Sequence, residues 1–302
     1  MRTSPLRGVL RFVVFLPLGL TVACGTGPAA VVAPEPVGPS IVAAPATTST
    51  PPAPMPKNPA PRPAPRIADR SAEPLIKAAG RVEPGTTLGV LVHDRLTGED
   101  LLAHNADRPF RTASLVKLLL AIDVLERGAT PTDRDRLTRM LSVSDDDLGS
   151  LYWVRQGGAE MLARTSARLG LTGVLPPEVP GQWGEVVMTP RDVAAIYRYV
   201  LDLRPAYRSL IVNALADAPR LAADGFDQHF GIPDGLGSPW AVKQGWGNND
   251  TAMVLHSTGL AGPDYRYVVV LLSEHPLGSG WDTSARSVTA AATALRGLLP
   301  AG

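Results

Sequence analysis

The chain has 302 residues and a formal net charge of +1 at pH 7, from 29 basic and 28 acidic side chains. This balance gives no electrostatic reason to expect binding to nucleic acid or to a strongly acidic partner. The length suits one large domain or two small ones, and the single cysteine excludes an internal disulfide.

Residues 1–24 have the pattern of an export signal. Three arginines precede an apolar run at residues 12–20, and small residues precede Cys24. The apolar run is too short to predict a transmembrane helix. Residues 20–24, Leu-Thr-Val-Ala-Cys, resemble a bacterial lipobox, which implies cleavage before Cys24 and lipidation of its sulfur. We therefore expect a lipid-anchored protein on the extracytoplasmic face of the cell membrane, with simple secretion as the alternative.

Residues 25–70 are predicted to form a linker. Thirteen prolines occur between Pro28 and Pro65, interleaved with Ala, Ser and Thr. This composition cannot bury a hydrophobic core and favours polyproline-like conformations that rise ~3.1 Å per residue. The linker would reach on the order of 100 Å. It would hold a single folded domain, predicted over residues 71–302, away from the membrane and toward the cell wall.

The predicted domain places strands at both chain ends around a helical block. Hydrophobic periodicity and turn residues mark these segments. The helices are expected at 71–80, from Ser114, at 132–143, 148–155, 158–169, 189–203 and 283–299, and the strands at 87–94, 100–104, 240–245, 251–257 and 265–273. This order predicts an α+β fold, in which an antiparallel sheet built from both ends carries an inserted helical subdomain.

Ser114 and Lys117 lie three residues apart at the head of an apolar helix, so they share one helical face. A serine beside a basic amine is the minimum for an activated nucleophile, and free N–H groups at a helix start favour a developing oxyanion. The alternative is a helix-capping serine beside a solvated lysine. The chain has four lysines against 25 arginines, and arginine stays protonated. The retained lysine therefore favours a catalytic role.

Two later motifs complete a recognisable set. Residues 144–146, Ser-Asp-Asp, lie in a predicted loop, and residues 243–245, Lys-Gln-Gly, lie on the first strand after the helical block. In this order the motifs resemble those of class A β-lactamases and serine D,D-peptidases, which carry S-x-x-K, S-x-N and K-[TS]-G on the same elements. The resemblance runs from about residue 85 to the C-terminus. The stretches 144–146, 230–236 and 241–246 resemble more closely the actinobacterial LppW-type lipoproteins, a β-lactamase-like group.

The resemblance implies a role for each motif. Ser114 would attack an amide carbonyl, Lys117 would act as or position the base, and Ser144 would pass a proton to the leaving nitrogen. Lys243 would assist that transfer and attract a substrate carboxylate, and the N–H groups of Ser114 and Trp246 would bind the oxyanion. The expected catalytic residues are Ser114, Lys117 and Ser144, and the expected substrate-binding residues are Asp146, Lys243, Gln244, Gly245 and Trp246.

Departures from the family pattern bear on turnover. Asp146 replaces Asn and adds negative charge near an anionic substrate, and Gln244 replaces a Thr or Ser hydroxyl. The helical block is short, with 30 positions between the first two motifs. Glu178 and Gln182 copy the spacing of the residues that hold the deacylating water in class A enzymes, but they lie close to the next helix. Glu178 is therefore predicted to be a solvated carboxylate, with a general base as the alternative.

Loss of one general base removes ~10²–10⁴ in rate. The sequence therefore predicts an exported lipoprotein of the serine hydrolase type that is acylated by β-lactams or peptidoglycan-type amides and deacylates poorly. Its expected partner is a small-molecule β-lactam or a peptidoglycan peptide, and it is expected to be a monomer without cofactor or metal. Two alternatives stay open: a catalytically inactive binding lipoprotein of the same fold, and an active class A-type β-lactamase.

Overall fold

The computed structural model describes residues 71–237 and 239–299. Cys24, the expected signal and the expected linker lie outside these residues. Within the two described ranges, no helix has both the length and the apolar character needed to cross a membrane.

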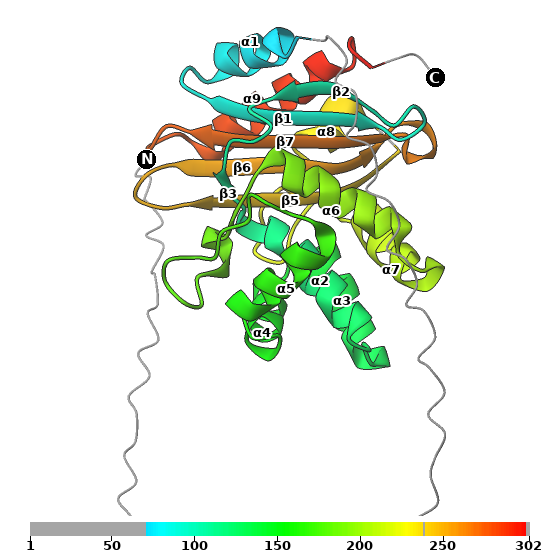
Figure 1. Cartoon of the computed structure of the whole chain (residues 1–302). Helices are drawn as coiled ribbons and strands as arrows, with labels where there is room; N and C mark the ends of the chain where they lie inside the picture. The colour runs from blue at the N-terminus through cyan, green and yellow to red at the C-terminus, as the bar shows by residue number, and fades with distance from the viewer. Residues whose placement is uncertain (1–70, 238, 300–302) are drawn as a thin grey trace, which may run out of the picture. The chain divides into compact units, whose positions relative to one another are not determined.

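One antiparallel sheet of five strands organises the fold, in the order β2-β1-β7-β6-β5 (Figure 1). The strands are β1 (Thr87–Asp94), β2 (Glu99–His104), β5 (Trp240–Asn248), β6 (Met253–Ala261) and β7 (Tyr267–His275). The two N-terminal strands pair with the C-terminal ones through β1 and β7. The predicted α+β fold, with a sheet made from both chain ends, is confirmed.

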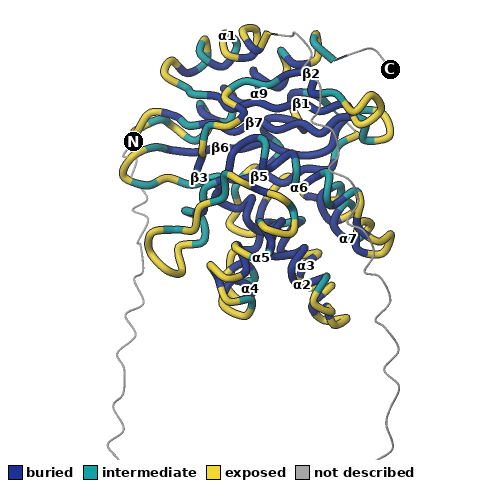
Figure 2. The backbone as a smooth tube through the Cα atoms, viewed as in Figure 1, coloured by how far each residue is buried: buried dark blue, intermediate teal, exposed yellow. Residues whose placement is uncertain are grey.

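The sheet separates two hydrophobic layers. Along β7, Val269 and Leu271 belong to one buried cluster while Val268 and Val270 belong to the other, because side chains alternate across a strand. One layer lies under α1 (Glu73–Val82), α8 (Ile232–Leu236) and α9 (Trp281–Leu295). The other layer lies under the helical subdomain, so the sheet is buried on both faces (Figure 2).

The helical subdomain is arranged around α2 (Val116–Glu126), of which ten of eleven residues are buried. A helix that is apolar on every side has to be surrounded by others. Its neighbours are α3 (Pro131–Ser142), α4 (Asp146–Arg155), α5 (Ala159–Leu169) and α6 (Pro190–Asp202), and α7 (Pro205–Ala216) packs on α3, α6 and β5. Capping boxes at Thr130 and Thr189 fix the starts of α3 and α6.

Short segments join the subdomain to the sheet. Strand β3 (Phe110–Arg111) pairs with β4 (Val187–Met188), and the single-turn helices η1 (Ala113–Leu115) and η2 (Trp183–Glu185) lie against each other. A third single turn, η3 (Pro263–Tyr265), connects β6 and β7. The β3–β4 pair brings the loop before α6 next to the start of α2.

Gly259 provides a test of how closely β5 and β6 pack. A Cβ atom at Gly259 would lie 2.3 Å from the carbonyl oxygen of Ala241 on β5. We expect Gly259→Ala to lower the free energy of unfolding by about 3 kcal/mol, because overpacking must move the backbone of β5. Gly80→Ala in α1 is the matched control, since nothing lies within 4 Å of its added Cβ; it should be neutral or stabilising by up to ~1 kcal/mol. Urea denaturation measures both, and equal stabilities would contradict the packing.

Candidate active site

Ser114 lies on η1, immediately before α2, and is 6% exposed. The preceding residue, Ala113, has a φ of +44°, a conformation that L residues adopt at a cost. Strand β5 lies close to this turn at Gly245, where a Cβ would be 2.8 Å from the Thr112 carbonyl oxygen. Only glycine allows this approach, so Gly245 sets the distance between the β5 edge and Ser114.

Lys117, one turn along the helix, is fully buried and its ammonium nitrogen is surrounded by oxygens. Nζ donates to Ser114 Oγ at 3.0 Å, to the Ser144 carbonyl at 2.7 Å and to Ser144 Oγ at 3.3 Å. It also forms a 2.5 Å ion pair with Asp146 Oδ1. The stem of Lys117 packs on Gly149, where a Cβ would lie 2.9 Å from Cε. The predicted pairing of Ser114 with Lys117 is present in the structure.

Ser144 lies between α3 and α4 with a φ of +56°. Asp145 follows as the N-cap of α4, accepting a hydrogen bond from Leu148 N, and pairs with Arg139. These contacts hold the turn so that Ser144 Oγ also accepts a 2.8 Å hydrogen bond from Lys243 Nζ. Ser114, Lys117, Ser144 and Lys243 therefore form one continuous hydrogen-bonded chain of hydroxyls and amines.

The two lysines of this chain share a buried environment. Burial lowers the pKa of Lys117, and the carboxylate of Asp146 partly offsets this by attraction and a hydrogen bond. Burial also lowers the pKa of Lys243 well below its ordinary value, and the positive charge of Lys117 lowers it further. Two cations this close in a dry site favour loss of a proton from one of them. The cluster is therefore suited to moving protons between serine hydroxyls.

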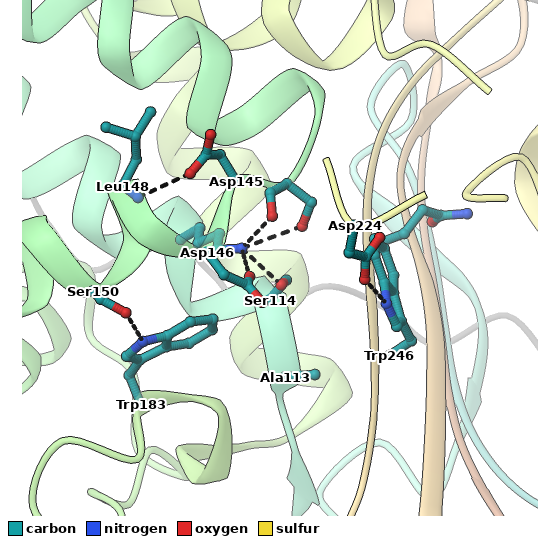
Figure 3. Close-up of polar contacts among 12 residues, drawn as sticks. Ala113, Ser114, Asp145, Asp146, Leu148, Ser150, Trp183, Asp224 and Trp246 are labelled. Atoms are coloured by element: carbon teal, nitrogen blue, oxygen red, sulfur yellow. Dashed lines mark hydrogen bonds and ion pairs between the residues drawn. The ribbon is translucent and has the colours of Figure 1, made fainter. Parts of the chain in front are cut away.

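Gln244 and Trp246 follow Lys243 on β5, and their side chains lie in different surroundings. The Gln244 amide donates to the carbonyl oxygens of Gln228 and Phe230 and is 1% exposed, so it is buried away from Ser114. The expected contact of this amide with a substrate carboxylate is not supported, because two backbone acceptors hold it. Trp246 is half-buried beside the site, and its indole N–H donates to Asp224 Oδ2 at 3.0 Å (Figure 3).

The loop before α6 contributes an aromatic ring to Lys117. Trp183 lies with its ring centroid 4.9 Å from Lys117 Nζ, and Ser150 Oγ accepts its indole N–H (Figure 3). Glu178 is exposed, and none of the contacts found for Lys117 involves it. Glu185 is bound by Arg111 and Asn249. An indole therefore lies beside Lys117, whereas Glu178, the alternative general base considered from the sequence, does not contact it.

His256 lies behind the site on β6 and links it to β3. Its Nε2 bonds the carbonyl oxygen of Arg111 at 2.6 Å, and its Nδ1 accepts from Ser273 N at 3.1 Å. Since Nδ1 accepts a backbone N–H, the ring is neutral with its proton on Nε2. Burial lowers the pKa of His256 to about 4.

This histidine should make the fold sensitive to acid. Between its ordinary pKa of 6.5 and about 4, the unfolded chain binds a proton that the folded chain excludes. The stabilisation is therefore complete above pH 6.5, and about 3 kcal/mol of unfolding free energy should be lost as the pH falls to 4. In His256→Gln this part of the pH dependence should disappear. Urea denaturation of both proteins at pH 7 and pH 4.5 measures it, and parallel losses would contradict it.

Two residues of the site were not expected from the sequence as contacts. Trp183 touches Lys117, and Asp224 fixes the indole of Trp246. Neither belongs to a catalytic motif, and both are brought in by loops whose path depends on tertiary packing. The described residues contain no group of three or more His, Cys, Asp or Glu side chains arranged to hold a metal ion.

The structure thus has a hydroxyl–amine cluster at the head of a buried helix, beside the edge strand of a five-stranded sheet, as expected from the resemblance of the motifs to those of β-lactamases. The model of the Beta-lactamase enzyme family, Beta-lactamase2, matches residues 72–130. An ancestral class A β-lactamase superposes with a TM-score of 0.61 at 19% identity, covering 76% of this chain and 99% of that one. The β-lactamase of Sphaerobacter thermophilus gives 0.60 at 20% identity, covering 77% and 100%.

The chain is also 35% identical over 230 residues to LppW of Mycobacterium tuberculosis and of Mycobacterium bovis, proteins that are named as lipoproteins. The match covers 72% of this chain and 71% of LppW. The chain belongs to this LppW family, which has the fold of the class A β-lactamases.

Proposed function

We propose that this protein is an exported, lipid-anchored serine hydrolase whose Ser114 is acylated by β-lactam or peptidoglycan-type amides and is released slowly. The observation that carries the proposal is the hydrogen-bonded chain from Ser114 Oγ through Lys117 Nζ and Ser144 Oγ to Lys243 Nζ. It provides a nucleophile, a buried amine able to accept its proton, and a second hydroxyl and amine to carry a proton onward.

The acylation step follows from these contacts. Ser114 Oγ attacks the amide carbon while its proton moves to Lys117, and a C–O bond forms. The N–H groups of Ser114 and Trp246 stabilise the oxyanion. When the tetrahedral intermediate collapses, the C–N bond breaks and the leaving nitrogen takes a proton through Ser144, with Lys243 supporting the transfer. The product is an ester on Ser114.

Hydrolysis of that ester requires a base that activates water. Trp183 occupies the side of Lys117 that faces the loop before α6, while Glu178 is exposed. Asp146, the carboxylate that does contact Lys117, is held in a 2.5 Å ion pair. Without a positioned base, deacylation should be slower by ~10²–10⁴ than in an enzyme that has one.

Intact-mass spectrometry of the full-length protein tests this function. After incubation with a penicillin, the protein should gain the mass of one molecule, and the adduct should persist for hours after the free compound is removed. Ser114→Ala should gain no mass. An unmodified wild-type protein, or an adduct that survives Ser114→Ala, would overturn the proposal.

The ion pair between Lys117 and Asp146 supports a second candidate function, that of a binding protein without turnover or acylation. An aspartate 2.5 Å from the amine opposes loss of the proton that a base must shed. This candidate predicts reversible binding of penicillin with no mass change. An active β-lactamase would instead show repeated hydrolysis of a chromogenic cephalosporin that is lost in Ser114→Ala.

We further propose that Cys24 is the lipid attachment site, with residues 1–24 as signal, 25–70 as linker and 71–302 as hydrolase domain. The family relationship to proteins named as lipoproteins supports this anchor. Phase separation in detergent tests it: the wild-type protein should enter the detergent phase, and Cys24→Ala should remain aqueous. Equal partitioning of the two would contradict lipidation at this cysteine.

A further inference from the structure

The entrance to the Ser114 site carries two carboxylates. Asp146 uses one oxygen on Lys117, and its side chain is 66% exposed. Asp224 is exposed and lies beside Trp246, across Ser114 from Trp183 (Figure 3). The charges of both aspartates act on Lys117 and on Lys243. A ligand approaching Ser114 therefore passes one carboxylate at the start of α4 and another on the segment between α7 and α8.

The positive groups nearby are already engaged. Lys243 Nζ donates to Ser144 Oγ and to the Gln244 carbonyl oxygen, and it is buried below the entrance. Arg139 pairs with Asp145, and Arg111 is bound by Glu185 and the Ala252 carbonyl. Both arginines are therefore already paired with an acid before an anionic ligand arrives.

Arg220, four residues before Asp224 in the sequence, is engaged as well. It pairs with Asp227 and Asp234 at 2.8 and 2.9 Å. The Gln244 amide, which could have met a carboxylate, is turned to two backbone carbonyls. Asp146 is paired with Lys117, whereas Asp224 forms none of the ion pairs found among the described residues, so Asp224 leaves unpaired negative charge at the entrance.

The Trp246 ring, which lies beside Asp224, also suits a cation. The Trp246 ring stacks on Phe226 at 4.8 Å between centroids and 17° between planes. Its N–H is held by Asp224, and the Phe226 backbone N–H donates to the same carboxylate at 2.9 Å. These contacts fix the indole in place, and Lys243 Nζ lies 6.0 Å from its centroid. An indole face attracts ammonium groups through its π electrons.

Resting on the acyl-serine chemistry proposed above, we propose that the Ser114 site selects acyl donors that carry an ammonium group beside the reacting amide, over donors with a carboxylate at the same position. The ammonium group lies against Trp246 and Asp224, with Asp146 adding attraction from the opposite side. This preference is the reverse of that expected for a site built around recognition of a carboxylate.

Three penicillins that differ only at the α carbon of a phenylacetyl side chain test the preference. They carry an ammonium group (ampicillin), a hydrogen (benzylpenicillin) or a carboxylate (carbenicillin). At pH 6 the rate constant for acylation of the full-length protein should fall in that order, by about tenfold from the first to the last. Equal rates, or fastest reaction with the carboxylate, would overturn the preference.

Asp224→Asn keeps an oxygen acceptor for the Trp246 indole while removing the charge. It should reduce the ammonium-to-carboxylate rate ratio by about threefold or more. Asp227→Asn is the matched control, since Asp227 is exposed on the same loop but pairs with Arg220; its ratio should stay close to wild type. If the ammonium-to-carboxylate rate ratio is unchanged in Asp224→Asn, this aspartate does not select the ammonium compound, and the proposal is contradicted.

Calorimetric binding of the same three compounds to Ser114→Ala separates selection from chemistry. Tighter binding of the ammonium compound supports the preference even if no compound acylates the wild-type protein, a result that would overturn only the proposed reaction. Equal affinities in Ser114→Ala would overturn the preference while leaving acylation untouched.

Discussion

Replacement of Lys117 by arginine should lower the rate of Ser114 acylation by about 10³. Arginine keeps the positive charge that pairs with Asp146 and the donors that meet Ser144, but it stays protonated and cannot accept the serine proton. The measurement is the second-order rate of adduct formation with a penicillin, followed by intact mass. Retention of the rate within a few-fold would contradict a base role for Lys117.

Two further variants serve as controls for this result. Arginine is larger than lysine, and the Lys117 stem already touches Gly149, so urea denaturation should accompany the kinetics. Lys117→Met is smaller and uncharged, and it should lose acylation to a similar extent. Lys77→Arg is the matched control because Lys77 is exposed on α1, and its acylation rate should equal that of the wild type.

Asp146→Asn should raise the rate of acylation at pH 7 by about tenfold and extend activity to lower pH. Burial already lowers the pKa of Lys117, and Asp146 opposes that effect by attraction and a hydrogen bond. Without the carboxylate charge the pKa of Lys117 falls further, so more of the amine is neutral at any given pH. The acid side of the acylation–pH profile should therefore move to lower pH.

The profile is measured from pH 5 to 9 with the wild type, Asp146→Asn and Asp147→Asn. Asp147 is the neighbouring exposed acid on α4, which makes it a control for general surface charge. Its profile should coincide with that of the wild type. An acid limb that stays in place in Asp146→Asn, or moves to higher pH, would show that Asp146 does not govern the protonation of Lys117.

Much of the fold follows from local pattern in the sequence. The strand at 87–94 and the helix at Pro190–Asp202 carry strong signals, namely an apolar run before a turn and a Thr-Pro start with a capping box. The paired strands β3 and β4 are each two residues long, which is too short to show the alternation of apolar and polar residues that marks a strand in a sequence. Helix α7 follows α6 within a few residues, so the helical pattern alone does not separate them.

The site shows the same division between local and tertiary information. Ser114 and Lys117 meet because three-residue spacing on a helix is sufficient, and Ser144 and Lys243 fall on the elements their motifs indicated. The direction of the Gln244 amide depends on carbonyls from residues 228 and 230, which a strand pattern does not encode. Trp183 likewise reaches Lys117 only through the path of a loop held by β3–β4 pairing.

The position of the acyl group tests the central claim most directly. Trypsin cleaves after Arg111 and Lys117, so the peptide 112–117 contains Ser114. After reaction with a penicillin and acid quench, this peptide should carry the mass of one molecule, with fragment ions that place it on Ser114 rather than Thr112. An unmodified 112–117 peptide in a protein that has gained mass, or a protein that gains none, would contradict Ser114 as the nucleophile.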